Sequence, residues 1–322
     1  MQLSIIIPVK NGRATLLPCL EKLRGLTLSH EIIVVNDHST DGGVSGALGL
    51  ADTIIDLEGA TGPGAARNAG AGIARGEILL FLDSDVFTSA ADIEKSHGEF
   101  RDGHYSCAVA RYRHNPGLSL LGRYYNLYMM YKYDHRATTT IFFSSYAMIK
   151  KECFLPFPER LLTLEDAALG QRLLETGQEI HIFRSLAVLH HKEVDAVGLT
   201  RQFCRRSRDA VVLAWSLYRQ GSAWRDDSVQ SGMRLSLVLV PLLVILSPFT
   251  GLALFLLLPL LLVNLPYFRY IKRFEGGAGL AASVLVYFYT IVCGDIGMAW
   301  GVVKVLIHEC MAAAEIRKTP LL

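Results

Sequence analysis

The sequence has little net charge and no cysteine-pair motif. Its 32 basic and 30 acidic residues give a formal charge of +2 over 322 residues, so charge does not favour a nucleic-acid partner. The six cysteines include no Cys-x-x-Cys pair and no zinc-like spacing, which predicts free thiols in a reducing compartment. The N-terminus lacks the basic start and apolar core of a signal peptide and begins at once with a strand-like run. We therefore expect the N-terminal part of the chain in the cytoplasm.

Apolar residues are concentrated in the C-terminal third of the chain. Mean hydropathy is +0.30 and 51% of all residues are hydrophobic, and residues 235–268 are a run of 34 positions without a charge. One helix needs only ~20 residues to cross a bilayer, and prolines and a glycine interrupt this run. We expect a membrane domain over residues 234–305, followed by a tail at 306–322. Its predicted spanning helices are about 235–250, 251–268 and 278–303.

Charges around the apolar segments predict their topology. Arg269, Lys272 and Arg273 follow the first apolar run. If that run folds as a hairpin, these cations stay on the cytoplasmic side, as the positive-inside rule requires, whereas one long span would place them outside. Asp295 is the only charge of the last segment and should either face other helices or lie near the membrane boundary. The sequence thus predicts a multi-pass protein of the inner (plasma) membrane, with helices lying in the membrane interface as the alternative.

A basic stretch precedes the apolar region. Seven arginines, with apolar residues between them, lie within residues 201–234. Such a segment beside a membrane domain is typical of an amphipathic helix on an anionic membrane surface, and we assign this role to about 201–226. An ordinary solvated helix face would show the same pattern.

Strand-like and helix-like segments alternate in the first half of the chain. The predicted strands are residues 3–9, 31–36, 54–55 and 77–82, and the predicted helices between them are 15–24 and 64–75. Such alternation indicates parallel strands joined by helices, a fold that binds its ligands at the carboxyl ends of the strands. Asp37 and Asp83 each follow a predicted strand directly. We therefore expect a binding site at that edge of the sheet.

Two segments at this edge are able to carry chemistry. Asp83, Ser84 and Asp85 place two carboxylates at the tip of a buried strand, where they either hold a divalent cation or form a simple polar turn. The small residues of the loop at 62–70 allow a ligand to approach the backbone closely, and Arg67 within it suits a phosphate partner.

Taken in order, these segments resemble the nucleotide-binding half of the family 2 glycosyltransferases. The matching stretches are Ser4 to Gly12, Val35 to Gly42, Ala66 to Gly70 and Leu82 to Asp85. The resemblance implies an α/β fold of the GT-A type, with a Rossmann-like, mostly parallel mixed sheet, over residues 1–226. It departs from the family at Asn36, where an aspartate is usual.

The same resemblance implies roles for individual residues. Those that it assigns to a nucleotide-sugar donor are Pro8, Val9, Asn11, Asp37, Arg67, Asp83 and Ser84. Asp83 and Asp85 are expected to meet the diphosphate and a Mg²⁺ or Mn²⁺ ion. His190 is expected as a third metal ligand, although the neighbouring His191 stays open for the same role.

Two further motifs concern the transfer step. An inverting transfer needs a base within hydrogen-bond reach of the acceptor hydroxyl. Glu165 and Asp166 resemble the family's Glu-Asp motif, and Asp166 is the expected base, unless both merely complement a helix dipole. Residues 202–206 resemble the Gln-x-x-Arg-Trp motif of processive members, but Arg206 replaces the tryptophan, which argues against processive synthesis. Arg205 and Arg206 remain suited to the departing diphosphate.

The sequence therefore predicts a membrane-anchored, metal-dependent, inverting glycosyltransferase with a cytoplasmic catalytic domain. Its expected donor is a nucleotide sugar, of the UDP type, and its expected acceptor is a lipid or a lipid-linked molecule. Two alternatives remain: a processive polysaccharide synthase, and a non-catalytic membrane module that binds nucleotide sugars.

Overall fold

The chain forms two compact units. The computed structural model describes all residues except Ala60, His135, Arg160, Leu162 and the ranges 225–230, 246–257 and 314–322. The N-terminal unit comprises Met1–Asn115 and Tyr133–Lys192, and the helical unit comprises Pro116–Lys132 and Glu193–Leu322. The domain boundary predicted at residue 226 stays a prediction.

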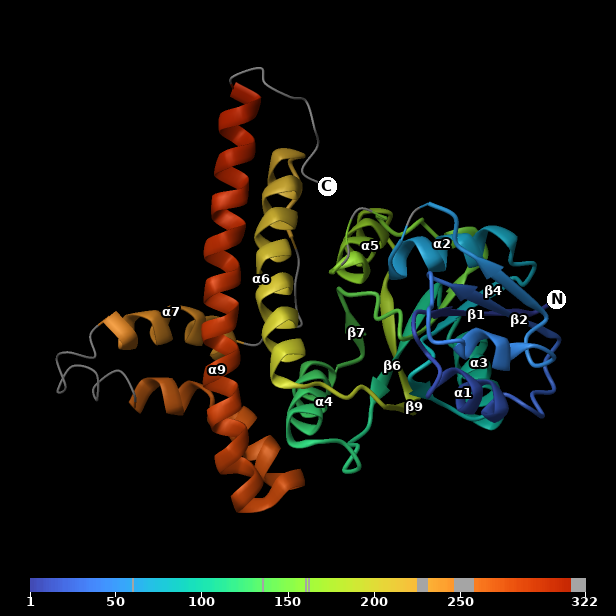
Figure 1. Ribbon diagram of the computed structural model, residues 1–322, viewed down its shortest axis with the longest axis horizontal. Helices are drawn as coiled ribbons and strands as arrows, with labels where there is room; N and C mark the ends of the chain where they lie inside the picture. Colours follow the sequence, from blue (N-terminus) through green and yellow to red (C-terminus); the bar gives the residue numbers. More distant parts are fainter. Residues whose placement is uncertain are drawn as a thin grey trace. The chain divides into compact units, whose positions relative to one another are not determined.

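A mixed sheet forms the centre of the N-terminal unit (Figure 1). Its strands are β1 (Leu3–Val9), β2 (His30–Asn36), β3 (Thr53–Asp56), β4 (Ile78–Leu82), β5 (Val86–Phe87), β6 (Cys107–Tyr112), β7 (Thr138–Thr139), β8 (Tyr146–Lys150) and β9 (Ile180–His190). The strand order is β3-β2-β1-β4-β8-β6-β9-β5, and β7 pairs with β9. The first four strands pair in parallel, whereas β8 runs antiparallel to both β4 and β6. The expected α/β class is confirmed.

Burial explains why the central strands are uniformly apolar. β4 consists of five buried residues, and β1 is buried at six of its seven positions. Parallel strands covered by helices on both faces read as continuous apolar runs rather than as alternating ones. Because β1, β2 and β4 are parallel, the loops that follow them leave the sheet at one edge, here called the carboxyl edge.

Helices cover both faces of this sheet. They are α1 (Leu16–Lys22), α2 (Pro63–Ile73), α3 (Ala90–Asp102) and α5 (Glu165–Glu175), with short 3₁₀ helices at η1 (Gly43–Ala47) and η2 (Lys151–Cys153). In Figure 1, α2 and α5 lie above the strands and α1 and α3 lie below them. α2 approaches the sheet closely at Gly70, where a Cβ atom would overlap Cγ2 of Ile6 and lie 3.2 Å from Cγ2 of Val35.

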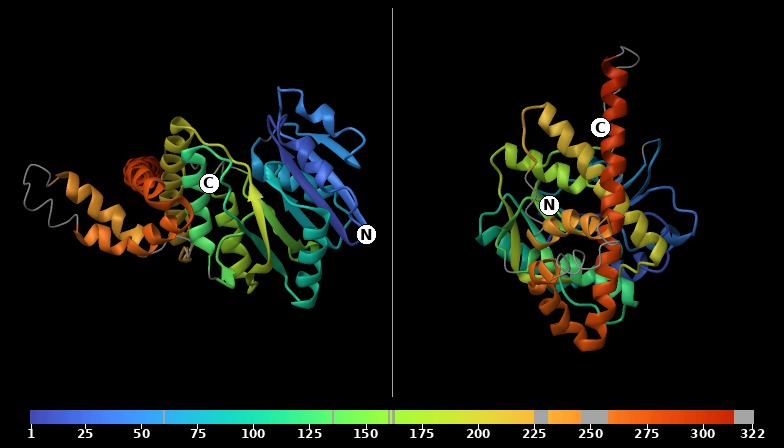
Figure 2. Two further views of the ribbon diagram at one scale, coloured as in Figure 1. Left: turned by 90° about the horizontal axis from the view of Figure 1, so that it is seen from below. Right: turned by 90° about the vertical axis from the view of Figure 1, so that its left-hand side faces the viewer.

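The helical unit is built around one long helix. Its elements are α4 (Leu120–Tyr133), α6 (Ala196–Arg219), α7 (Ser231–Ile245) and α9 (Leu265–Ala313). α6 runs beside α9 in both figures of the whole chain (Figure 2), and glycines of α9 permit this close approach. A Cβ atom at Gly301 would lie 2.7 Å from the carbonyl oxygen of Arg208, and one at Gly297 would lie 2.8 Å from Cα of Cys204.

The expectation of three membrane spans is not supported. Within the described residues, one helix is long and apolar enough to cross a bilayer, Leu265–Cys310, with 46 residues and a mean hydropathy of 1.7 over an 18-residue stretch. The interruption expected between residues 268 and 278 is a kink at Gly276 (φ 67°) inside α9, because the charged residues before it continue the helix. α7 has 15 residues, fewer than the ~20 that a span needs. Residues 251–257 of the predicted 251–268 helix lie outside the described residues, and residues 258–263 and 265–268 are helical. A multi-pass topology is therefore not supported, whereas one C-terminal anchor is consistent with α9.

The close contact at Gly70 yields a stability prediction with a matched control on the same helix. In Gly70→Ala the added methyl collides with the fully buried Ile6, and we expect a loss of about 1–3 kcal/mol of unfolding free energy. In Gly72→Ala the methyl meets nothing within 4 Å, and its higher helix propensity should raise stability by up to about 1 kcal/mol. Urea unfolding of both variants checks this; equal midpoints would contradict the packing of α2 on β1.

Candidate active site

A buried arginine joins three segments at the carboxyl edge. Arg67 lies in the first turns of α2 and is 3% exposed. Its Nη2 donates to Oδ1 of Asp83 at 2.7 Å, and its Nη1 donates to Oε1 of Glu165 at 3.0 Å. The guanidinium also lies 5.5 Å from the ring centroid of Phe157. Burial opposes its charge, but the carboxylates of Asp83 and Glu165 raise the pKa of Arg67 above its ordinary value. The arginine therefore fixes the end of β4 against the start of α5.

The predicted nucleoside residue Asp37 lies in a cage of donors. It is 4% exposed at the end of β2. Its carboxylate accepts hydrogen bonds from the backbone N–H of Gly62 at 3.1 Å, from Nζ of Lys10 at 3.3 Å and from Nδ1 of His38 at 3.2 Å. Burial opposes ionisation, but the bonds from His38, Lys10 and Gly62 hold the pKa of Asp37 below its usual range. Asp37 therefore presents a buried negative charge between the loops after β1 and β2.

Two asparagines tie the loops of this edge together. Oδ1 of Asn11 accepts from the backbone N–H of Thr40 at 2.9 Å, and the N–H of Asn11 donates to Oγ of Ser39 at 3.0 Å. Asn36 donates from Nδ2 to Asp56 at 2.6 Å while its Oδ1 accepts from the N–H of Ser39 at 2.9 Å. An aspartate at position 36 would face the carboxylate of Asp56 without a proton to donate. Asn36, which replaces the usual aspartate, can therefore donate a hydrogen bond to Asp56, whereas an ionised aspartate cannot.

The backbone at this edge is strained at the loops that bear these residues. Asn11 and His38 have φ of 54° and 55°, and Leu164, which precedes α5, has φ of 64°. Non-glycine residues with positive φ are uncommon and are maintained only where the surroundings compensate for them. Here each of them adjoins one of the polar clusters just described.

Asp85 and His190 form a pair on neighbouring segments. Nε2 of His190 lies 3.3 Å from Oδ1 of Asp85, and the imidazole stacks on Tyr112 with ring centroids 5.0 Å apart. Burial opposes ionisation of Asp85, but the charge and the hydrogen bond of His190 hold the pKa of Asp85 below its ordinary value. The ring of His191 instead lies 4.2 Å from that of Phe87, and its backbone N–H donates to the carbonyl of Asp85. Of the two histidines, the side chain of His190 is the one paired with Asp85.

The donor set at Asp85 suits a divalent ion, although the three predicted ligands do not form one cluster. Carboxylate and imidazole donors together suit Mn²⁺, and Asp85 and His190 lie within reach of one another. Oδ1 of Asp83 is bound to Arg67 instead. Among the described residues no group of three or more His, Cys, Asp or Glu side chains is placed to hold a metal ion. Asp85 and His190 are therefore the candidate ligands. Asp83 is two residues before Asp85 in the chain, and Arg67 binds its Oδ1 rather than its Oδ2.

Glu165 and Asp166 begin α5 with different partners. Glu165 is buried and is bound to Arg67. Asp166 is half-buried, and its Oδ1 accepts only a local bond from the N–H of Ala167 at 2.8 Å. The helix dipole favours both charges at this position. Of the two carboxylates, Asp166 is the one without an ion pair in the described contacts.

The remaining predicted residues lie in two places. Val9 is buried at the end of β1, where its carbonyl accepts from the N–H of Asp37 at 2.8 Å, and Pro8 precedes it. Ser84 lies 3.4 Å from the hydroxyl of Thr15. Arg205 and Arg206 belong to α6 in the helical unit, not to the unit that holds the other residues.

Sequence reasoning missed several partners of these groups. Phe157 under Arg67, Tyr112 on His190, and the donors Lys10 and Gly62 around Asp37 were not predicted. All four contacts join segments that are far apart in the chain, so no local pattern marks them. Only Gly62 carried a signal, as the first glycine of the small-residue loop.

The bridging role of Arg67 is testable by unfolding. Arg67→Met removes the guanidinium and leaves two carboxylates facing each other, so we expect a loss of about 3–5 kcal/mol of unfolding free energy. Arg24→Met removes an exposed arginine and should change stability by less than about 0.5 kcal/mol. Chemical denaturation of both variants decides; similar losses in the two would show that Arg67 does not hold the edge together.

Comparison with known proteins places the N-terminal unit in a family. The sequence pattern described as glycosyl transferase family 2 matches residues 4–154. A poly(ribitol-phosphate) beta-glucosyltransferase of Bacillus spizizenii is 37% identical over 96 residues, which are 27% of this chain and 15% of that protein. A dodecaprenyl-phosphate galacturonate synthase of Rhizobium johnstonii is 31% identical over 103 residues, 29% of this chain and 30% of that protein. The chain thus spans less than a third of either relative.

Solved structures share the fold. The mannosyltransferase PcManGT from Pyrobaculum calidifontis, in complex with GDP-Man and Mn²⁺, has a TM-score of 0.57 at 15% identity, over 93% of this chain and 87% of that one. Glucosyl-3-phosphoglycerate synthase from Mycobacterium tuberculosis, in complex with phosphoglyceric acid, has a TM-score of 0.50 at 17% identity, over 72% and 82%. Residues 4–154 therefore match glycosyl transferase family 2 in sequence, and the solved structures show that the N-terminal unit has the GT-A fold.

Proposed function

We propose that the protein transfers a sugar from a nucleotide-sugar donor to a lipid-linked acceptor, with inversion at the anomeric carbon. The observation that carries this proposal is that the two carboxylates at the start of α5 have different partners. Arg67 neutralises Glu165, so that Asp166, one residue later, keeps a carboxylate that is not engaged in an ion pair. A base of this kind takes the proton of the acceptor hydroxyl as its oxygen attacks the sugar.

The donor is proposed to bind along the carboxyl edge. The buried Asp37 carboxylate suits the hydrogen-bond donors of a nucleobase, next to Pro8 and Val9, and a uracil nucleotide is our first choice. Asn11 and Ser84 shape the loops on either side. Arg205 and Arg206 are proposed to stabilise the departing diphosphate.

A divalent ion, Mg²⁺ or Mn²⁺, is proposed as the cofactor. Asp85 and His190 would hold it, with Asp83 beside them. When bound, such an ion neutralises the negative charge of the leaving nucleoside diphosphate. The Mn²⁺ present in the complex of PcManGT supports a metal in this fold.

The proposed acceptor follows from the helical unit and from one relative. α9 has the length and composition to anchor the chain in a bilayer, which would hold the GT-A unit close to lipid substrates. The Rhizobium johnstonii relative is named for dodecaprenyl phosphate, which is a polyprenyl phosphate. We therefore propose a lipid-linked acceptor at the cytoplasmic membrane surface.

The proposed base has a direct test. Asp166→Asn should abolish transfer, with a loss of at least about 100-fold in kcat, because the amide cannot accept the acceptor proton. Donor affinity should persist, since the side chain of Asp166 is held by a local hydrogen bond from the N–H of Ala167. The control Glu175→Gln, at the exposed end of the same helix, should keep full activity. Assays with a panel of nucleotide sugars and native lipid extract, read by mass spectrometry, check this; near-normal turnover in Asp166→Asn would remove Asp166 from the role.

Variants of the two adjacent histidines test the proposed metal site. His190→Gln should raise the Mn²⁺ concentration for half-maximal activity by about tenfold or more, because it removes an imidazole beside Asp85. His191→Gln should leave that concentration unchanged, since its ring packs on Phe87. Metal titrations of both variants compare them, and an equal shift in both would argue against the assignment.

A further inference from the structure

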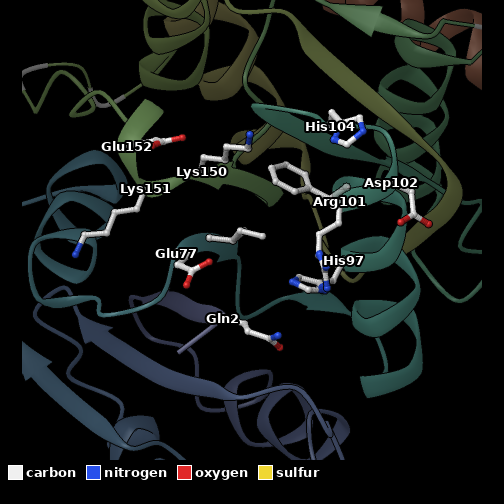
Figure 3. Close-up of a pocket in the computed structure, with 11 residues that line it drawn as sticks. Gln2, Glu77, His97, Arg101, Asp102, His104, Lys150, Lys151 and Glu152 are labelled. Carbon is white, nitrogen blue, oxygen red and sulfur yellow. The ribbon is translucent and has the colours of Figure 1, made fainter.

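A large open cleft lies at the opposite edge of the GT-A sheet. Figure 3 shows it at the amino ends of β1 and β4, where Gln2 precedes β1, and Glu77 and Ile78 begin β4. The end of α3 and the end of β8 complete its wall. Its volume is about 1320 Å³, at least that of an ordinary small-molecule site. Because β4 separates Ile78 from Asp83, this cleft and the carboxyl edge lie at opposite ends of one strand.

His97 is the feature of this cleft that packing does not explain. α3 buries Ile93, Ser96, His97 and Phe100, the spacing of an apolar helix stripe. His97 is 3% exposed as a residue, and within the described chain its ring nitrogens have no hydrogen-bond partner. These nitrogens are not among the enclosed polar atoms of the described residues that lack a partner, so they remain accessible from the cleft. The imidazole faces the cleft, so a ligand there can satisfy it.

The chemistry around His97 is that of an anion site. Burial, and then the charge of Arg101, lower the pKa of His97, and a neutral imidazole has one N–H to donate. Arg101 follows one turn later on α3, and Figure 3 shows its guanidinium beside the imidazole. Lys150, at the end of β8, also lines the cleft. In the described contacts, neither cation is engaged by a carboxylate of the chain.

The other side of the cleft offers acceptors and an apolar surface. Glu77 and Gln2 line it with side-chain oxygens that have no partner among the described residues. Carboxylate and amide oxygens accept hydrogen bonds from hydroxyl groups. Ile78 and Phe100, both largely buried, are the apolar residues that line the cleft. A ligand that fits both sides carries one acidic group and several hydroxyls.

We propose that this cleft is a second ligand site, separate from the transfer site, that binds a sugar phosphate or a similar polyhydroxy phosphate through Arg101 and His97. The phosphate meets the guanidinium and the imidazole N–H, and the hydroxyls meet Glu77 and Gln2. The mixed charges of the walls disfavour a long polyanion such as a nucleic acid.

Calorimetric titration of the full chain in detergent with glucose 1-phosphate tests this proposal. Glucose and inorganic phosphate serve as the two half-ligands, and each should bind at least about tenfold more weakly. Arg101→Gln and His97→Phe should each weaken binding by about tenfold or more, because each removes a charge-assisted or buried donor to phosphate. Arg24→Gln, an exposed arginine elsewhere in the unit, should bind as the parent does. Asp85→Asn should also leave binding unchanged.

Stability separates a binding role from a structural one for His97. Since His97→Phe replaces an unpaired polar group with an apolar one in an apolar stripe, its urea midpoint should stay equal or rise. Lost stability together with retained binding would overturn the proposal. So would the absence of binding to the parent protein, or binding that Asp85→Asn abolishes and His97→Phe retains. Inorganic phosphate binding as tightly as glucose 1-phosphate would overturn the assignment to a sugar phosphate.

Discussion

The buried guanidinium of Arg67 is the interaction on which the active edge depends. It satisfies Asp83 at the tip of β4 and Glu165 at the start of α5, two residues that lie 82 positions apart in the chain. Removing a charge from such a buried group leaves its partners uncompensated, which costs far more than the loss of a surface ion pair. Asn68, on the next position of α2, exchanges two hydrogen bonds with the backbone of Phe157, at 2.7 and 2.9 Å. α2 therefore holds both the strand tip and the segment before α5, and Asp166 takes its position from them.

The loops at this edge are set by short polar side chains rather than by regular structure. Asn11 binds the loop after β2, and Asn36 binds both that loop and the end of β3. The amide of Asn36 is required by its two different partners, one acceptor and one donor, and a carboxylate provides only one of these functions. The strained backbone at Asn11 and His38 is compensated by these bonds and brings donors around Asp37.

The two ends of the sheet have opposite character. At the carboxyl edge nearly every named charge has a partner within the chain: Asp37 has its three donors, Arg67 its two carboxylates and Asp85 its histidine. At the amino edge His97 is buried without one, and the charges beside it are open to the cleft. Internal pairing preorganises a site for catalysis, whereas unsatisfied groups that converge on a cavity favour an external ligand. The helical unit is organised differently, by close backbone contact at the glycines of α9.

Local sequence patterns were enough to predict several elements of the fold. Continuous apolar runs defined β1, β2 and β4, and a polar residue directly after a strand predicted that Asp37 and Asp83 lie at one edge, because parallel strands end together. Which of those residues bind one another depends on the folded chain. Contacts between distant segments bind Arg67 to Glu165 and Asn36 to Asp56. They also place His97 at a cleft. The same holds for α9, where the charged residues 269–273 predicted a break between two apolar segments but are helical, and the backbone departs from helical geometry at Gly276 instead. Local pattern determines which face of an element is apolar, but pairing of charges requires the positions of both partners, and these exist only once the chain has folded.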